Sequence, residues 1–348
     1  MLEQKKTSPL SLACKRQGYD SIQLMRGVAA VSVIFHHILM FTNGAFGVDL
    51  FFCISGFIMM YITEKNGDKF LEKRAIRIIP LYWLGTLAVI ALLLVVPQYF
   101  NSTNLSVPRI IKSFLFIPYA DDVSGYPLLI QGWTLVCEVF FYVVFFVSMK
   151  ISHKQRHMIS SGILCAVVAV SAILGERISP DIKNYYGNPM MLEFIFGMIG
   201  YKFITYKTSL NEQSKSGKQS VILLIVAVAL WAFLFSQKYI PFLHDINRVI
   251  SWGIPSFLFF LLIFRYFKNR SVPLPFVFIG NISYSLYITH TFIVHPFSRL
   301  VYDISVFSPV GVLLVFVVVI PLCLAVAFVS WFLIEYKFTM YLRKKFKI

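Results

Sequence analysis

The chain has 348 residues, of which 58% are hydrophobic and 14% are charged, and its mean hydropathy is +0.73. A soluble domain of this length would be far more polar, so the composition excludes that class and predicts an all-α, polytopic integral membrane protein. The net charge of +16 lies mostly outside the apolar segments, which is typical of membrane topology and anionic-lipid contact and does not indicate nucleic-acid binding.

The chain begins with a polar, basic stretch that contains neither an apolar signal core nor a small-residue cleavage site. We therefore expect that nothing is removed and that the first helix doubles as the insertion signal. Three parts are predicted: a cytoplasmic N-terminal tail at 1–20, a transmembrane domain at 21–336, and a basic cytoplasmic C-terminal tail at 337–348.

Apolar segments of spanning length recur along the whole chain, and about ten are predicted. They lie at 22–41, 46–63, 77–97, 130–149, 157–174, 188–206, 219–236, 246–267, 276–297 and 308–334. The last is long enough to be tilted, or to be broken at Pro321. An even number of spans places both termini on one side of the membrane.

Lys and Arg are shared unequally between the two sides that these segments define. The two tails and alternate loops, together with Arg26, carry 25 of the 32, and the opposite side carries seven. By the positive-inside rule, the side with 25 is the cytoplasm. We therefore expect both termini to be cytoplasmic.

The first segment carries Arg26, His36 and His37, where a plain membrane anchor would carry no ionisable group. Such groups are costly in hydrocarbon, so they usually face a partner, a cavity or a substrate. Arg26 and His37 are nearly three helical turns apart, so they share one face about 16 Å apart, whereas His36 is rotated roughly 80° away. This favours a functional role for His37. The alternative is that the histidines are packing residues that donate to a neighbouring helix.

Further carboxylates and imidazoles are predicted at one depth, in the exterior half of the later segments. They are Asp49 at the start of the second segment, Glu138 in the fourth, Glu193 in the sixth, and His290 and His295 in the ninth. This shared depth predicts a polar site in the outer half of the membrane. The alternative is that these residues are paired polar contacts that hold the helix bundle together.

A cationic cluster marks the cytoplasmic start of the third segment. Arg74 and Arg77 lie about one helical turn apart there, just after Lys69 and Lys73. Guanidinium groups at this spacing suit bidentate binding of phosphate oxygens. The alternative is a positively charged anchor that contacts lipid phosphates.

Five motifs follow one another along the chain and carry a resemblance. They are Arg26 with His37, GVDLFFCISGFIM at 47–59, RAIRIIPLYW at 74–83, GWTLVCEVFFY at 132–142, and the later pair NPMMLEFIFG and NISYSLYITH. In this order the chain resembles the membrane-bound acyltransferase family 3, from Arg26 to about Glu335. The last two stretches are most similar to O-acetyltransferases of exopolysaccharide and O-antigen modification.

The resemblance implies an integral membrane O-acyltransferase of the bacterial inner (plasma) membrane. Such an enzyme would move acetyl from cytoplasmic acetyl-CoA to a hydroxyl of a cell-envelope polysaccharide or its lipid-linked precursor. Acetyl-CoA would be a co-substrate, and no bound cofactor is expected. The five cysteines have no paired spacing and four fall in apolar segments, so neither a disulfide nor a metal site is predicted.

Each candidate residue then has an expected role. His37 can accept the proton of a sugar hydroxyl or accept the acyl group itself, and Asp49 or Glu138 can orient it. Arg26 would mark the throat of the acyl-CoA path, and the resemblance assigns Arg74 and Arg77 to the nucleotide of acyl-CoA. The residues expected to line the acceptor pocket are Glu193, Trp133, Tyr284 and His290.

Two other classes of protein remain possible from the residues alone. A proton-coupled membrane transporter would also keep intramembrane His, Asp and Glu as a relay, although it would more often contain internal repeats and paired broken helices. A non-catalytic subunit of a polysaccharide-export complex would need none of these charges in register. Transfer of labelled acetyl by the purified protein distinguishes the three.

Overall fold

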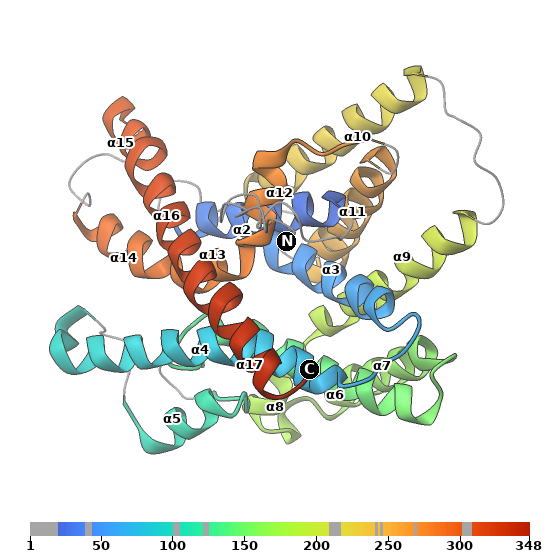
Figure 1. Ribbon diagram of the computed structural model, residues 1–348, viewed down its shortest axis with the longest axis horizontal. Helices are drawn as coiled ribbons and strands as arrows, with labels where there is room; N and C mark the ends of the chain where they lie inside the picture. Colours follow the sequence, from blue (N-terminus) through green and yellow to red (C-terminus); the bar gives the residue numbers. More distant parts are fainter. Residues whose placement is uncertain are drawn as a thin grey trace, which may run out of the picture. The chain divides into compact units, whose positions relative to one another are not determined.

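The computed structural model describes residues 20–38, 44–99, 105–120, 125–208, 217–240, 243, 246–267, 270–300 and 308–348, and within these ranges it is helical without any β-strand (Figure 1). Residues 1–19, most of the expected N-terminal tail, lie outside the described part. The chain divides into two compact units. The first comprises Met1–Phe51 and Gln213–Lys337, and the second comprises Phe52–Glu212 and Phe338–Ile348.

The first unit is built around α2, which packs against α12 and α13. Its α-helices are α2 (Asp20–His37), the start of α3 (Phe46–Ile62), α10 (Gly217–Ser236), α11 (Ile254–Phe267), α12 (Leu274–Asn281), α13 (Ser283–Thr289), α14 (Thr291–Leu300), α15 (Pro309–Leu314) and α16 (Ile320–Ser330). π-Helical stretches occur at Val249–Gly253, Val315–Val319 and Trp331–Phe338, and a 3₁₀ turn at Gln237–Tyr239.

Close packing in this unit depends on a glycine in α12. A Cβ atom built at Gly280 would lie 1.9 Å from the carbonyl oxygen of Gln23 in α2. Only a residue without a side chain therefore lets the two backbones approach this closely, as is common where membrane helices pack. The contact fixes α12 against the helix that carries Arg26 and His37.

The second unit is built mainly from α4, α6, α7 and α9. Its elements are the remainder of α3, α4 (Phe70–Val95), α5 (Val107–Phe114), α6 (Gly132–Ile151), α7 (Arg156–Leu174), α8 (Pro180–Tyr185), α9 (Leu192–Thr208) and α17 (Thr339–Lys345), with 3₁₀ turns at Pro97–Tyr99, Gly175–Arg177 and Pro189–Met191. Stacked rings fill its core: Phe194 lies 4.5 Å from Phe52 and 4.3 Å from Phe141 between ring centroids. Residues expected to form the basic C-terminal tail continue as helix in α17.

Five helices of the described part are long and apolar enough to cross a membrane. They are Phe70–Val95, Gly132–Ile151, Arg156–Arg177, Val249–Phe267 and Pro309–Lys345, and the bent pair Leu274–Asn281 and Ser283–Arg299 would make a sixth. Each of the ten expected segments overlaps a helix, with α3 and Val221–Ser236 among the shorter apolar ones. The total of ten spans and the cytoplasmic termini stay predictions.

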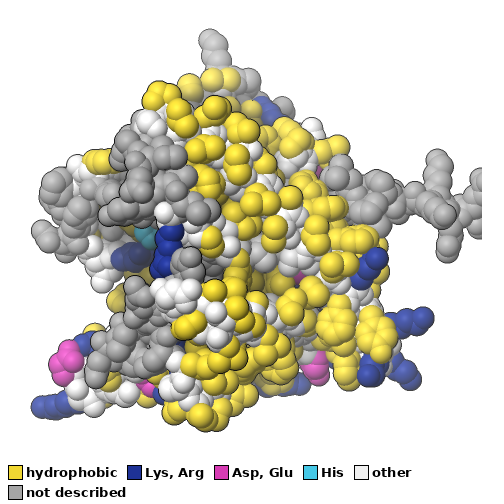
Figure 2. Space-filling model, turned by 90° about the vertical axis from the view of Figure 1, so that its left-hand side faces the viewer, with side chains coloured by type: hydrophobic (Ala, Val, Ile, Leu, Met, Phe, Trp, Pro, Cys, Tyr) yellow, Lys and Arg dark blue, Asp and Glu magenta, His cyan; other side chains and the backbone are white. Residues whose placement is uncertain are grey.

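Exposed apolar side chains support the assignment of the chain as a membrane protein. Hydrophobic side chains cover much of the face in Figure 2. On the run from α15 to α16, Leu313, Phe316 and Val317 are at least half exposed, which would be unfavourable in water but not in lipid.

Two predicted segments are modified in ways that the sequence did not specify. The segment expected at 276–297 is not one straight helix, because α12 and α13 meet at Ile282 with a bend of 55°. The last segment belongs to a continuous run of 37 residues from Pro309 to Lys345. A π-helical stretch ends just before Pro321, where the missing N–H and the bulk of the proline ring disturb regular hydrogen bonding.

Candidate active site

Imidazoles from two helices meet in the first unit. His37 lies in the last turn of α2, and His290 directly follows the last residue of α13. Their ring centroids are 5.0 Å apart, and Nε2 of His290 lies 3.3 Å from Nδ1 of His37. His290 is fully buried and His37 is partly buried. The rings of His36 and His295 flank His37, at 5.1 and 6.1 Å between centroids.

Backbone carbonyls assign the protons of this pair. Nδ1 of His290 lies 2.8 Å from the carbonyl oxygen of Tyr287 and 3.2 Å from that of Leu286, so it carries hydrogen and donates, which leaves Nε2 of the neutral ring as an acceptor. Nδ1 of His37 faces this acceptor and the carbonyl oxygen of Val33 at 2.9 Å, so it also carries hydrogen.

The consequence lies on the other nitrogen of His37. In the neutral ring, Nε2 then holds the lone pair, and it has no hydrogen-bond partner among the described residues. A ring held by one nitrogen while the other keeps a lone pair is suited to act as a general base or as a nucleophile. His290, which the sequence placed in the acceptor pocket, is thus the group that contacts His37.

Arg26 lies on the same helix, as its position in the sequence requires. Its side chain is buried, and Nη1 donates to the side-chain oxygen of Gln23 at 3.1 Å. The uninterrupted helix α2 keeps Arg26 and His37 on one face, about 16 Å apart along the axis.

Asp49 has a different partner from the one expected. Its carboxylate is fully buried and forms a bidentate pair with Arg248, with Nε 3.1 Å from Oδ1 and Nη2 2.7 Å from Oδ2. Arg248 also donates to the carbonyl oxygen of Ala45 at 3.0 Å and lies over the ring of Trp252, 4.4 Å from its centroid. The expectation that Asp49 orients His37 is therefore corrected, because both carboxylate oxygens are engaged by the guanidinium group.

Sequence analysis counted Arg248 only as an exterior cation. The available signal was its position two residues into the apolar segment at 246–267, where the rule applied to Arg26 would also have selected it. In the structure, the π-helical stretch Val249–Gly253 begins immediately after it.

A second buried carboxylate escaped notice in the sequence. Glu335, in the π-helical stretch Trp331–Phe338, accepts hydrogen bonds from the backbone N–H of Ser285 at 3.0 Å and from its hydroxyl at 2.6 Å. Ser285 follows Tyr284 in the first turn of α13, and Tyr284 is half-buried. An ionisable residue at the end of the last apolar segment was the available signal.

The second unit holds another polar set, around Glu138 in α6. Ser55 in α3 donates to the Glu138 carboxylate at 2.8 Å, and the buried hydroxyl of Tyr142 donates to the same oxygen. Arg74 in α4 interacts electrostatically with Tyr142 and Glu138. Within the described residues, Nε and Nη1 of Arg74 are buried without a hydrogen-bond partner, so this guanidinium keeps donors available for an anion.

The remaining predicted residues also lie in the second unit. Arg77 is partly buried on α4, three residues after Arg74. Glu193 is fully buried in the first turn of α9, where the helix dipole favours a negative charge, and Trp133 is half-buried in the first turn of α6. The structure thus brings together His37 with His290, and Arg74 with Glu138, each within one unit.

Comparisons with known proteins agree in the class of protein that they indicate. A family model described as an acyltransferase domain matches residues 19–331. The exopolysaccharide production protein ExoZ of Rhizobium meliloti (strain 1021) is 33% identical over 268 residues, which are 74% of this chain and 78% of that protein. The protein named "Putative acetyltransferase ORF330" of Acidianus two-tailed virus is 26% identical over 303 residues, 82% of this chain and 86% of that protein. No solved structure matches the chain.

Proposed function

Because the chain belongs to this acyltransferase family and is a membrane acyltransferase, we propose that it transfers acetyl from cytoplasmic acetyl-CoA to a hydroxyl of a cell-envelope polysaccharide or of its lipid-linked precursor. The observation that carries the proposal is the lone pair on Nε2 of His37, held in place by His290. The acceptor class is supported by the relative named for exopolysaccharide production. The proposed location is the bacterial inner membrane.

His37 acts as the general base in the proposed reaction. Its Nε2 takes the proton of the acceptor hydroxyl, and the oxygen forms a bond to the thioester carbonyl carbon. The C–S bond then breaks, and the thiolate of CoA leaves with the proton held by the imidazolium. The products are an O-acetyl ester and CoA, and neutral His37 is regenerated.

A second route uses the same lone pair as the nucleophile. Nε2 attacks the thioester and CoA leaves, and the acceptor hydroxyl then takes the acetyl group from the imidazole. Release of one equivalent of CoA by protein without acceptor would identify this route, whereas direct transfer releases CoA only when acceptor is present.

Arg74 and Arg77 bind the phosphates of the donor in this proposal. The free donor atoms of Arg74 support this role, because a buried guanidinium with unused N–H groups is a favourable partner for phosphate oxygens. The concentration of Lys and Arg on the predicted cytoplasmic side is consistent with a donor made in the cytoplasm.

The test is transfer of labelled acetyl by the purified protein in lipid nanodiscs. Acetyl-CoA and envelope glycan from cells that lack the protein are supplied, and label in the glycan is measured. We expect transfer by the parent, loss of transfer with His37→Ala, and substantial activity with His36→Ala. Equal loss in both variants, with normal membrane insertion, would remove the assignment of His37.

A further inference from the structure

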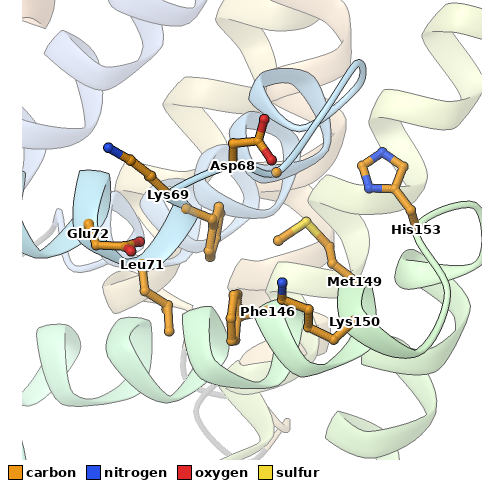
Figure 3. A pocket seen from close by; sticks show the side chains of 10 residues that line it. Asp68, Lys69, Leu71, Glu72, Phe146, Met149, Lys150 and His153 are labelled. Carbon is orange, nitrogen blue, oxygen red and sulfur yellow. The ribbon is translucent and has the colours of Figure 1, made fainter. Parts of the chain in front are cut away.

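A pocket of about 370 Å³ lies within the second unit, where the start of α4 meets the end of α6 (Figure 3). Four of its lining residues are apolar side chains, three can carry a positive charge and two are carboxylates. These are Phe70, Leu71, Phe146 and Met149; Lys69, Lys150 and His153; and Asp68 and Glu72. No step of the proposed reaction has used this pocket.

The apolar wall of the pocket suits a planar ring. Phe146 is partly buried, and Lys150 lies with Nζ 5.4 Å from the centroid of its ring. Phe70 behind it is held by Tyr142 and Phe145, at 6.0 and 5.7 Å between centroids. Figure 3 shows the ammonium group of Lys150 pointing into the space beside Phe146 and Met149. Flat aromatic surface beside a cation favours a base attached to a phosphate.

The polar groups of the pocket retain unused hydrogen-bonding capacity. Nε2 of His153 is buried and has no partner among the described residues. Lys69 adopts a left-handed conformation, with φ of 50°, at the N-cap of α4 and provides no side-chain cap. Within the described part, the backbone N–H groups of Leu71 and Glu72 therefore stay available for phosphate oxygens at the start of a long helix.

The mixture of charges narrows the class of ligand. A small inorganic anion would be repelled by Asp68 and Glu72, and an acyl chain would have to desolvate all the charged groups. A nucleoside phosphate uses both signs: phosphate oxygens accept from Lys150 and His153, while ribose hydroxyls and the exocyclic amine of the base donate to carboxylates.

The pocket also lies in line with the polar set of the same unit. Glu138, Tyr142, Phe146 and Lys150 are spaced by four residues and share one face of α6. Lys150 and Glu138 are roughly 18 Å apart along the helix, which is comparable with an extended pantetheine arm. Arg74 lies about one turn beyond Phe70 in α4, between the pocket and the level of Glu138.

We propose that this pocket binds the 3′-phosphoadenosine end of the acyl-CoA donor, an inference that rests on the proposed function. The pantetheine arm then extends along α6 past Arg74 towards Glu138. The pocket recognises the part of the donor most distant from the thioester, so it contributes to binding and not to the chemical step.

Two measurements test the proposal. The first is binding of adenosine 3′,5′-bisphosphate to the full-length protein in nanodiscs. The parent should bind the probe, Lys150→Ala should bind it about tenfold more weakly because a hydrogen bond to a charged group is lost, and Lys154→Ala should bind it like the parent. Lys154 is the control because it is an exposed cation beside the same helix end but does not line the pocket.

The second measurement compares donors. Lys150→Ala should raise the KM for acetyl-CoA about tenfold but leave the KM for acetyl-pantetheine, which lacks the nucleotide, unchanged. If Lys150→Ala alters neither bisphosphate binding nor the KM for acetyl-CoA, the pocket is not the nucleotide site. If the parent transfers acetyl from neither donor, the proposed function fails, and the binding measurement alone decides the fate of the pocket.

Discussion

At the scale of single residues, the feature that governs the proposed chemistry is which nitrogen of His37 carries hydrogen. His290 reaches Nδ1 of His37 only because its own Nδ1 is engaged by the carbonyl oxygens of Leu286 and Tyr287. A residue that fixes the tautomer of a base acts through that base. We therefore describe His290 as a positioning residue.

The first prediction follows from this role. His290→Ala should lower kcat roughly 10²-fold, since general-base catalysis depends on the correct tautomer and ring orientation. His290→Gln should retain more activity, because its amide oxygen can accept from Nδ1 of His37. The KM for acetyl-CoA should change little in either variant. Steady-state kinetics with purified variants provides the measurement, and equal losses for alanine and glutamine would contradict a positioning role.

The second prediction concerns the pair between Asp49 and Arg248. Arg248 keeps 37% of its side chain exposed whereas Asp49 has none, so removing the arginine leaves the more deeply buried charge uncompensated. Arg248→Met should therefore lower the free energy of unfolding by about 3–5 kcal/mol, and Asp49→Asn should cost less. The double variant should recover part of the loss.

Residual folded protein after heating, followed by size-exclusion chromatography in detergent, measures these differences. Equal thermal stability of Arg248→Met and the parent would show that the buried carboxylate does not need its partner. Activity of the double variant then reports whether Asp49 has any role besides this pair.

At the scale of elements, the break between α12 and α13 places His290. A helix that starts inside a packed unit exposes unsatisfied N–H groups in its first turn, and Ile282 at the N-cap has no side chain to accept from them. Glu335 supplies the missing acceptor to the N–H of Ser285, and its charge also suits the positive end of the helix. The carboxylate therefore acts as a cap donated from another helix.

The third prediction tests this cap. Glu335→Ala leaves buried donors on Ser285 unsatisfied and should lower stability by about 1–3 kcal/mol, with a loss of kcat because α13 carries His290. Glu335→Gln keeps an acceptor oxygen and should lose less of both. Thermal unfolding and the transfer assay are the measurements, with the exposed Glu64→Ala as the control. A glutamine variant as damaged as the alanine variant would indicate that charge, and not capping, is what α13 requires.

The same elements explain how far the sequence alone could predict this structure. Helices were recognisable because their apolar runs are long, and His37 because an ionisable group in such a run is costly. The break at Ile282 was not, because its stabilising partner Glu335 lies more than fifty residues away. The partner of Asp49 was missed for a similar reason: pairing with Arg248 depends on how helices distant in sequence pack, which a single sequence does not encode locally.

At the scale of the whole molecule, sidedness is the property on which the proposed reaction most depends. An enzyme that takes acetyl from cytoplasmic acetyl-CoA and modifies an envelope glycan needs its donor site to open to the cytoplasm. The distribution of 25 against seven Lys and Arg residues predicts that the start of α4 faces the cytoplasm and that the chain preceding α6 faces the exterior.

The fourth prediction is therefore a labelling pattern. Tyr126 and Lys65 are both exposed, and they lie on opposite predicted sides of the membrane. In intact spheroplasts an impermeant thiol reagent should label Tyr126→Cys and miss Lys65→Cys, and permeabilised cells should label both. The parent chain with its five native cysteines gives the background. The reverse pattern would invert the orientation, and it would remove the binding of acyl-CoA phosphates by Arg74 and Arg77, because acetyl-CoA is absent from the exterior side.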